Sequence, residues 1–183
     1  MKIEKVIIAG FGGQGIITLG YIIAYAGMFD NLYVSHIPSY GAEMRGGTAN
    51  CSVIISSEEI ASPIITEATT AIIMNQPSLT KFENKIASNG LLILNSDMIN
   101  TSPSRNDLKL ILLPANKKAE EIGNLKSANI FMCGIFAGIT KIITPQSVKS
   151  AIKEYFKTKP QKIIDLNLKA FDAGFAKAQK MKN

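Results

Sequence analysis

Residues 10–15 read Gly-Phe-Gly-Gly-Gln-Gly and combine residue types that can hold a phosphate. An apolar run precedes them and an apolar, helix-type pattern follows, which is the order of a strand, a turn and a helix. Gly10, Gly12 and Gly15 fit the pattern G-x-G-x-x-G, in which glycine permits a positive φ and lets backbone amides approach an anion. Gly13 is a further position without a side chain. The spacing predicts either an anion at a helix N-terminus or a tight corner without a ligand.

The residues around this glycine loop limit which phosphate-bearing ligands it could bind. No lysine follows the last glycine as in a Walker A motif, which argues against an ATP phosphate site. A nicotinamide site would place an acidic residue at the end of the second strand, but residues 35–38 read Ser-His-Ile-Pro. Asp30 comes before that strand. Another phosphate-bearing ligand, a contact with another subunit and a purely structural turn remain open.

A second unusual stretch, residues 40–47, reads Tyr-Gly-Ala-Glu-Met-Arg-Gly-Gly. It follows a predicted strand, so in a doubly wound fold it should lie at the carboxyl edge of the sheet beside the glycine loop. Arg45, followed by Gly46 and Gly47, could hold a carboxylate or phosphate through two hydrogen bonds. Glu43 could instead pair with Arg45 and leave the loop without a ligand.

Other residue types that carry chemistry are sparse. His36 is the single histidine and has no Ser/Asp partners at triad spacing. Cys51 and Cys133 lie far apart and no CxxC occurs, which excludes a zinc ribbon or a four-thiolate iron–sulfur cluster made by this chain alone. We interpret both cysteines as buried thiols of a cytoplasmic protein. The residues therefore predict part of an active site without a catalytic group of its own.

Apolar runs of strand type alternate with helical patterns over the first two thirds of the sequence. Most of these runs are continuous, as expected for strands covered on both faces. Strand–helix–strand order at this spacing predicts right-handed parallel units. The fold class is therefore α/β, with a Rossmann-like, doubly wound, mainly parallel sheet, helices on both faces and a helical C-terminal third. The expected strands are Lys5–Ala9, Leu32–His36, Asn50–Ser56, Thr70–Met74, Leu91–Asn95 and Lys109–Leu113.

The C-terminal third carries the clearest helix signals. Thr144 should cap a helix that begins at Pro145, and Asn129 should cap another that begins at Ile130. The second helix contains three small residues, which we interpret as a permanent subunit interface: Gly134, Ala137 and Gly138. No linker or repeat interrupts the chain, so we expect a single domain over residues 1–183.

Composition sets limits on the class of protein. The 183 residues are 46% hydrophobic and 19% charged, with a formal net charge of +6, which indicates a globular chain. Basic and aromatic residues do not interleave, so a nucleic-acid partner is not expected. No apolar segment reaches the roughly 20 residues that a membrane helix needs, and no signal-peptide layout is present. An anionic substrate or an acidic partner would suit the basic balance.

These motifs together resemble a known family. The segments GFGGQGIITLG, PSYGAEMRGGTANCSV and the Ser62-Pro63 pair are similar to the gamma subunits of 2-oxoacid:ferredoxin (or acceptor) oxidoreductases. Weaker likenesses downstream are NIFMCGIFAGIT, TPQSVKSAIKEYF and NLKAFDAGF. The resemblance covers nearly the whole chain, whose short format is most similar to the gamma subunit of four-subunit 2-oxoglutarate enzymes.

The resemblance implies a function within a complex. Such enzymes decarboxylate a 2-oxoacid oxidatively to an acyl-CoA, here succinyl-CoA, with CO2 and reduced ferredoxin or flavodoxin. Thiamine diphosphate, magnesium, coenzyme A and iron–sulfur clusters would be used by the complex, and this chain alone would bind none of them. Alpha, beta and delta subunits would be its partners. We expect the isolated chain to be inactive and to self-associate through its uncovered apolar surface. Alternatives are a free-standing dinucleotide-binding protein, or a gamma subunit of a pyruvate or indolepyruvate enzyme.

The resemblance also implies which residues face the interior of the complex. They would contact coenzyme A, another phosphate or a facing subunit, and none would be catalytic. They are Gly10, Gly12, Gly13, Gln14, Gly15, Tyr40, Glu43, Arg45, Gly46 and Gly47.

Overall fold

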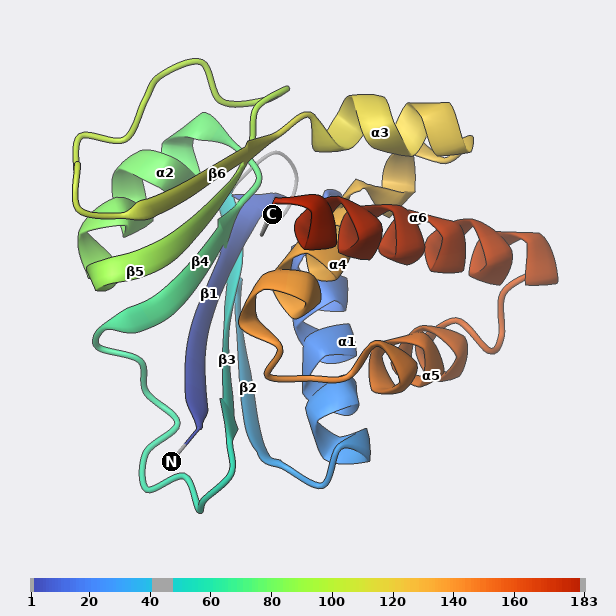
Figure 1. Cartoon of the computed structure of the whole chain (residues 1–183), viewed down its shortest axis with the longest axis horizontal. Helices are drawn as coiled ribbons and strands as arrows, with labels where there is room; N and C mark the ends of the chain where they lie inside the picture. Colours follow the sequence, from blue (N-terminus) through green and yellow to red (C-terminus); the bar gives the residue numbers. More distant parts are fainter. Residues whose placement is uncertain (1, 41–47, 182–183) are drawn as a thin grey trace.

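The computed structural model describes residues 2–40 and 48–181, with the side chain of Tyr40 excepted. These residues form a six-stranded sheet in the order β2-β3-β1-β4-β5-β6 (Figure 1). Each predicted strand is present, most of them one to five residues longer than expected. The strands are β1 (Ile3–Phe11), β2 (Tyr33–Tyr40), β3 (Thr48–Ser56), β4 (Ala68–Ile73), β5 (Ile86–Asn95) and β6 (Lys109–Leu113).

Helices cover both faces of the sheet, as predicted. Figure 1 shows α2 on one face and α1, α4, α5 and α6 stacked on the other. Two short 3₁₀ helices, η1 (Glu83–Lys85) and η2 (Leu125–Ser127), complete the set. None of the described helices is both long and apolar enough to cross a membrane. The helices are α1 (Ile16–Phe29), α2 (Gln76–Phe82), α3 (Ala115–Ile122), α4 (Ala128–Thr140), α5 (Pro145–Tyr155) and α6 (Gln161–Lys180).

The sheet departs from an all-parallel order at one strand. β1, β4, β5 and β6 pair in parallel, whereas β3 pairs antiparallel with both β1 and β2. β1 and β2 therefore run in the same direction, as the strand–helix–strand pattern predicts, but β3 lies between them. Only residues 41–47 separate β2 from β3, too few for the crossover that a parallel pairing of neighbours would need. The short connection explains the antiparallel strand.

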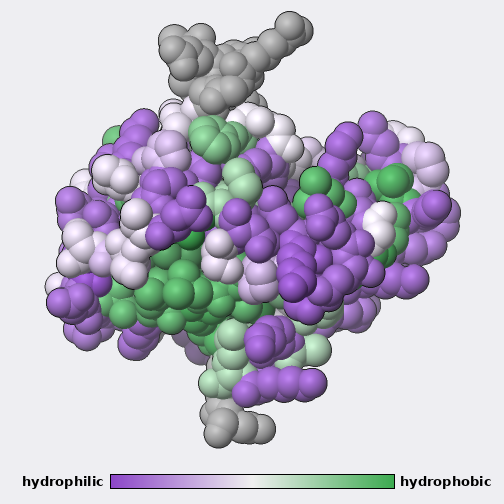
Figure 2. All heavy atoms as spheres, turned by 90° about the horizontal axis from the view of Figure 1, so that it is seen from above, coloured by the Kyte–Doolittle hydropathy of each residue, from purple (hydrophilic) through white to green (hydrophobic). Residues whose placement is uncertain are grey.

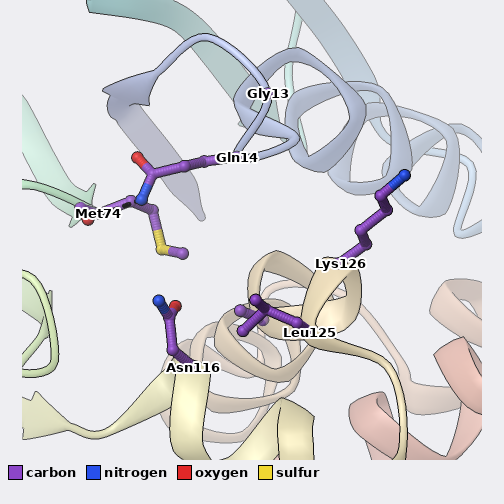
Figure 3. Close-up of a pocket in the computed structure, with 7 residues that line it drawn as sticks. Gly13, Gln14, Met74, Asn116, Leu125 and Lys126 are labelled. Carbon is purple, nitrogen blue, oxygen red and sulfur yellow. Dashed lines mark hydrogen bonds between the residues drawn. The ribbon is translucent and has the colours of Figure 1, made fainter. Parts of the chain in front are cut away.

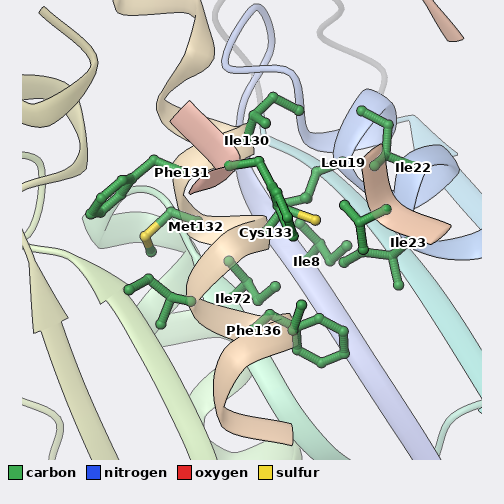
Figure 4. Close-up of a cluster of buried hydrophobic side chains, with 14 of the residues drawn as sticks. Ile8, Leu19, Ile22, Ile23, Ile72, Ile130, Phe131, Met132, Cys133 and Phe136 are labelled. Atoms are coloured by element: carbon green, nitrogen blue, oxygen red, sulfur yellow. The ribbon is translucent and has the colours of Figure 1, made fainter. Parts of the chain in front are cut away.

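The main core lies between one face of the sheet and the helices that cover it, which include α1 and α4. Figure 4 shows α4 crossing over β1 and β4, with side chains of α1 beside it. Ile8, Ile72 and Phe136 are each fully buried in this cluster. A second, smaller cluster packs under α2 and includes Leu79 and Phe82. Because both faces of the central strands are covered, their sequences are continuous apolar runs.

Small residues on α4 pack against α6 of the same chain, and the interpretation of them as a subunit interface was wrong. A Cβ placed on Gly134 would overlap the carbonyl oxygen of Phe171, and one placed on Gly174 would overlap that of Phe131. A Cβ on Gly138 would lie 2.5 Å from the Cβ of Ala178. The glycines allow the two helix backbones to touch, which places the apolar side chains of α4 in the core.

Of the two helix caps predicted in the C-terminal third, one is confirmed and one is wrong. Thr144 caps α5, because its Oγ1 accepts a hydrogen bond of 3.2 Å from the backbone N–H of Ser147. The cap assigned to Asn129 was wrong, since α4 begins at Ala128, two residues before the predicted start at Ile130, and Asn129 lies inside its first turn. The side chain of Asn129 instead reaches the glycine loop, as described below.

The close contact of α4 and α6 gives a stability prediction. Gly174→Ala should lower the free energy of unfolding by about 1–3 kcal/mol, because the added methyl group forces backbone atoms apart. This loss outweighs the gain of roughly 0.4–1 kcal/mol that alanine brings by restricting the unfolded chain. Urea denaturation measures the change. Gln179→Ala, at an exposed position of the same helix, should stay within about 0.5 kcal/mol of the native chain. Equal stability of the two variants would contradict the packing described here.

Candidate functional site

The glycine loop joins the carboxyl end of β1 to the N-terminus of α1. Gly13 and Gly15 have φ angles of 92° and 72°, a region that side-chain-bearing residues rarely adopt. A Cβ on Gly15 would also overlap the side-chain amide of Asn129, whereas one on Gly13 would meet open space. Two of the predicted glycines are therefore required by backbone conformation, and Gly15 also by close packing.

Gln14 joins the ends of two parallel strands. Its Oε1 accepts a hydrogen bond of 2.6 Å from the backbone N–H of Phe11, and its Nε2 donates one of 3.2 Å to the carbonyl oxygen of Met74. Figure 3 shows the Gln14 side chain extended toward Met74. A Cβ on Gly10 would lie 2.6 Å from the Gln14 Oε1, so glycine at this position makes room for the amide.

Asn129 holds the loop from the opposite side. Its Nδ2 donates a hydrogen bond of 2.9 Å to the carbonyl oxygen of Gly15, and its Oδ1 accepts one of 2.9 Å from the N–H of Ile130. The residue is 3% exposed. In the sequence, Asn129 is a polar residue at the start of an apolar segment, a pattern that predicts a helix cap. Its actual role is to fix the entry of α1 against α4.

A cleft of about 180 Å³ opens beside the loop. It lies at the carboxyl ends of β1 and β4, whose following helices leave toward opposite faces of the sheet (Figure 1). Such a switch point is the usual ligand position in open α/β sheets. Figure 3 shows Leu125 and Asn116 extending toward the opening from the side opposite Gln14. The lining residues are Gly13, Gln14, Met74, Asn116, Leu125, Lys126 and Ala128.

The electrostatics of this cleft favour an anion. Its lining includes Ala128, the first residue of α4, and Gly13 and Gln14 of the loop that leads into α1, and neither helix has a side-chain cap or an acidic residue in its first turn. Their N-termini therefore present partial positive charge. Lys126 adds a full charge and is exposed to solvent. Among the described residues that line the cleft, Lys126 is the one titratable side chain.

Asn116 is oriented by a neighbouring strand. Its Oδ1 accepts a hydrogen bond of 3.0 Å from the Nδ2 of Asn95, a fully buried residue at the end of β5. The Oδ1 of Asn95 accepts a further bond of 3.1 Å from the N–H of Ala115. These bonds leave the amide N–H groups of Asn116 as the polar group on this side of the cleft. No motif in the sequence pointed to Asn116 or Lys126.

The structure brings part of the predicted site together. Gly13 and Gln14 line the cleft, and the backbone of Tyr40 pairs with Ala49, which pairs in turn with Gly10. The ends of β1 and β2 therefore lie at the same edge of the sheet, as expected. Four further predicted residues lie outside the described residues: Glu43, Arg45, Gly46 and Gly47.

Asp30 lies far from the cleft and supports the helices instead. It follows the C-terminus of α1, whereas the glycine loop precedes the N-terminus of the same helix. Its carboxylate accepts hydrogen bonds from the N–H and Oγ1 of Thr144 and from the Oγ of Ser147. It thus holds the start of α5 and has no place beside a ribose at the cleft.

The remaining candidate nucleophile and base residues lie in packed surroundings, with His36 half-buried and both cysteines buried. The His36 ring lies 4.5 Å from the Tyr21 ring between centroids, and burial lowers the pKa of its imidazole. Cys51 and Cys133 are free and buried, and burial raises the pKa of each thiol to about 12. Within residues 2–40 and 48–181, no three His, Cys, Asp or Glu side chains gather where they could hold a metal ion.

A glycine loop at the switch point of a doubly wound sheet defines the Rossmann-like class of α/β domains. Comparison with known proteins identifies the family. The chain belongs to the pyruvate ferredoxin/flavodoxin oxidoreductase family, whose model matches residues 5–177.

Two relatives with assigned names illustrate the similarity. VorA, a subunit of the ketoisovalerate oxidoreductase of Methanothermobacter marburgensis, is 38% identical over 96% of this chain. The chain spans only 37% of the length of VorA. KorC, a subunit of the 2-oxoglutarate synthase of Methanothermobacter thermautotrophicus, is 32% identical over 93% of both chains.

Two solved structures share the fold. The gamma subunit of a keto/oxoacid ferredoxin oxidoreductase from Geobacter sulfurreducens superposes with a TM-score of 0.85, at 27% identity over 97% of both chains. The 2-oxoglutarate:ferredoxin oxidoreductase of Magnetococcus marinus, solved with 2-oxoglutarate, coenzyme A and succinyl-CoA bound, gives a TM-score of 0.89 at 25% identity. That alignment covers 98% of this chain and 32% of the other.

The double contact of Gln14 gives a prediction about stability. Gln14→Ala leaves the N–H of Phe11 and the carbonyl of Met74 without their partner, which should lower the free energy of unfolding by roughly 1–3 kcal/mol. Chemical denaturation measures this loss. Gln146→Ala, at an exposed position of α5, is the matched control and should change stability by less than about 0.5 kcal/mol. A Gln14 variant as stable as the control would show that the amide does not hold the strands.

The buried cysteines give a prediction about reactivity. With the pKa of both thiols at about 12, almost no thiolate exists at pH 8, and neither sulfur is accessible. A maleimide reagent at pH 8 should therefore leave the folded chain unlabelled and label both thiols after denaturation. Mass spectrometry counts the labels. Rapid labelling of the folded chain would contradict the burial described here.

Proposed function

We propose that this chain is the gamma subunit of a thiamine-dependent 2-oxoacid:ferredoxin or acceptor oxidoreductase. Such an enzyme converts a 2-oxoacid and coenzyme A to an acyl-CoA, CO2 and reduced acceptor. The observation that carries the proposal is the family match over residues 5–177, which includes the glycine loop and the segment 40–47. The similarity to KorC and to the Geobacter gamma subunit, over nearly the full length of each, supports the subunit format.

The chain's own residues suit a supporting part in that reaction. The described lining of the cleft offers amide groups and one lysine, a set that suits binding of an anion and includes no carboxylate, imidazole or thiol to pair with the lysine in acid–base catalysis. We assign the thiamine diphosphate, magnesium and iron–sulfur chemistry to alpha, beta and delta partners. VorA, more than twice as long as this chain, supports this division, because its remaining sequence has no counterpart here. The isolated chain is then inactive.

The substrate of the complex has two candidates with specific support. 2-Oxoglutarate is supported by KorC, which matches this chain over 93% of both lengths. Ketoisovalerate is supported by VorA, whose identity is higher at 38% but whose length differs. We propose 2-oxoglutarate, with succinyl-CoA as product, and keep the branched 2-oxoacid as the second candidate.

Within the complex, we assign the cleft and the glycine loop to a phosphate of coenzyme A or to an anionic group of a facing subunit. The N-termini of α1 and α4 and the charge of Lys126 support an anion there. A cleft of about 180 Å³ has room for a phosphate group but not for a whole coenzyme A, so the rest of the ligand would lie outside it. Arg45 and Glu43 of the segment 40–47 complete the proposed contact surface.

One experiment tests the identity of the complex. The tagged chain is expressed in its native cells, purified with its partners and assayed for dye reduction with four 2-oxoacids. Activity that needs thiamine diphosphate and is stimulated by coenzyme A should co-purify. Greater activity with 2-oxoglutarate than with ketoisovalerate, pyruvate or indolepyruvate would support the substrate proposed here. A chain that purifies alone and binds a dinucleotide would overturn the proposal.

A second experiment tests the anion contact. In the purified complex, Arg45→Ala and Lys126→Ala should each raise the apparent KM for coenzyme A by about tenfold, since a lost charge-assisted hydrogen bond costs roughly 1.5–3 kcal/mol. Lys153→Ala, an exposed lysine of α5, is the control and should leave KM unchanged. If neither variant alters KM or assembly, the contact with coenzyme A is wrong while the subunit assignment stands.

A further inference from the structure

A second cleft, larger than the first, lies between the end of β6 and the helices α3, α4 and α6. Its volume is about 460 Å³ and it shares no lining residue with the cleft at the glycine loop. Leu113, Ile122 and Phe131 are among the apolar residues of its floor. Ala173 and Ala176 of α6 keep one wall low, because their side chains are a single methyl group. We call this cleft the α3–α6 groove.

Apolar surface continues from this groove along the edge of the sheet. β6 is the last strand in the sheet order, so one side of its backbone has no neighbour among the described strands. Leu110 and Leu112 of this strand are 41% and 53% exposed. Figure 2, which looks down on the side where β6 and α3 lie in Figure 1, shows a hydrophobic area bordered by hydrophilic side chains. An apolar edge strand of this kind usually marks a surface that another chain covers.

The charges around the groove are mainly positive. Its lining includes Lys118, Lys177 and Lys180, against a single acid, Glu121. Glu121 is neutralised by an ion pair of 2.6 Å with Lys118. Lys177 and Lys180 belong to the last turn of α6, where they also favour the helix dipole. With three lysines and one glutamate, the described lining of the groove carries a net charge of about +2.

The positive charge of the rim favours some binding partners of the groove over others. A second copy of the chain, docked by a two-fold axis through the groove, would bring the lysines of one rim against those of the other. A chain with acidic residues meets the opposite charge instead. A groove with walls from α3 and α6 and an apolar floor fits an amphipathic helix, whose apolar stripe lies in the groove while its flanking residues reach the rim.

We propose that the α3–α6 groove docks an acidic amphipathic helix of a partner protein. Leucine-type side chains at i, i+3 or i+4 and i+7 fill the space above Leu113, Ile122 and Phe131. Glutamate or aspartate residues beside that stripe pair with Lys177 and Lys180. The groove is thus an interaction surface in its own right, independent of which 2-oxoacid the complex uses and of what binds at the glycine loop.

The test uses the full chain and a synthetic, fluorescein-labelled helical peptide with leucines at this spacing and glutamates beside them. Fluorescence anisotropy should show saturable binding that weakens as salt concentration rises. A peptide with lysines in place of the glutamates should bind at least about tenfold more weakly. Equal binding of the acidic and basic peptides, or no binding of the acidic one, overturns the proposal.

Variants of the chain locate the binding. Lys177→Glu with Lys180→Glu should weaken binding of the acidic peptide at least about tenfold, and Ala176→Trp should abolish it by filling the groove. The matched control is Lys162→Glu with Lys169→Glu, which makes the same change of charge at exposed positions elsewhere on α6. Thermal unfolding confirms that each variant is folded.

Two results would contradict the groove as the docking site. One is an equal loss of binding in the control and the groove variants, which would mean that only net charge matters. The other is a native chain that dimerises in sedimentation experiments while Ala176→Trp stays monomeric, which would make a second copy the occupant.

Discussion

The side-chain amide of Gln14 is the contact on which the arrangement of the site depends. One amide group bonds to the end of β1 through Phe11 and to the residue after β4, Met74, so it ties the ends of the two strands together. After Gln14 the chain turns through Gly15, which has a positive φ, into α1. Asn129 fixes the other side of that turn through the carbonyl of Gly15. Two neutral amides, bonded only to backbone, leave the loop rigid and add no negative charge to the cleft.

Much of the fold could be predicted from the sequence, because the signals for strands and helix caps depend on residues that are close together in the chain. The strands covered by helices on both faces are continuous apolar runs, and a threonine followed by a proline marks the start of α5. What failed depends on partners distant in the sequence. Small residues such as Gly134 predict a close backbone contact but do not say whose backbone is near, and here it belongs to α6. The antiparallel course of β3 follows from the short connection before it, a constraint that a pattern of apolar runs does not express.

The candidate site was only partly predictable for a similar reason. The glycine loop could be recognised in the sequence because its conformation needs glycine at two nearby positions, Gly13 and Gly15, within a segment that is unusually rich in glycine. Asn116 and Lys126 come from α3 and η2 and look like any surface residues in the sequence. Their importance arises from the positions to which β5 and α4 bring them. The segment 40–47 was singled out by composition, and the described ends of β2 and β3 lie at the expected edge.

The contact between Gly15 and Asn129 spans 114 residues of sequence, and it has a consequence for synthesis on the ribosome. β1 and α1 are synthesised before α4, and their apolar side chains, such as Ile8 and Leu19, belong to the same core cluster as those of α4. Until α4 has been synthesised, these side chains remain exposed on the nascent chain, since contacts between residues far apart in the sequence form late. A chaperone that binds exposed apolar segments would be expected to bind the nascent chain at this stage.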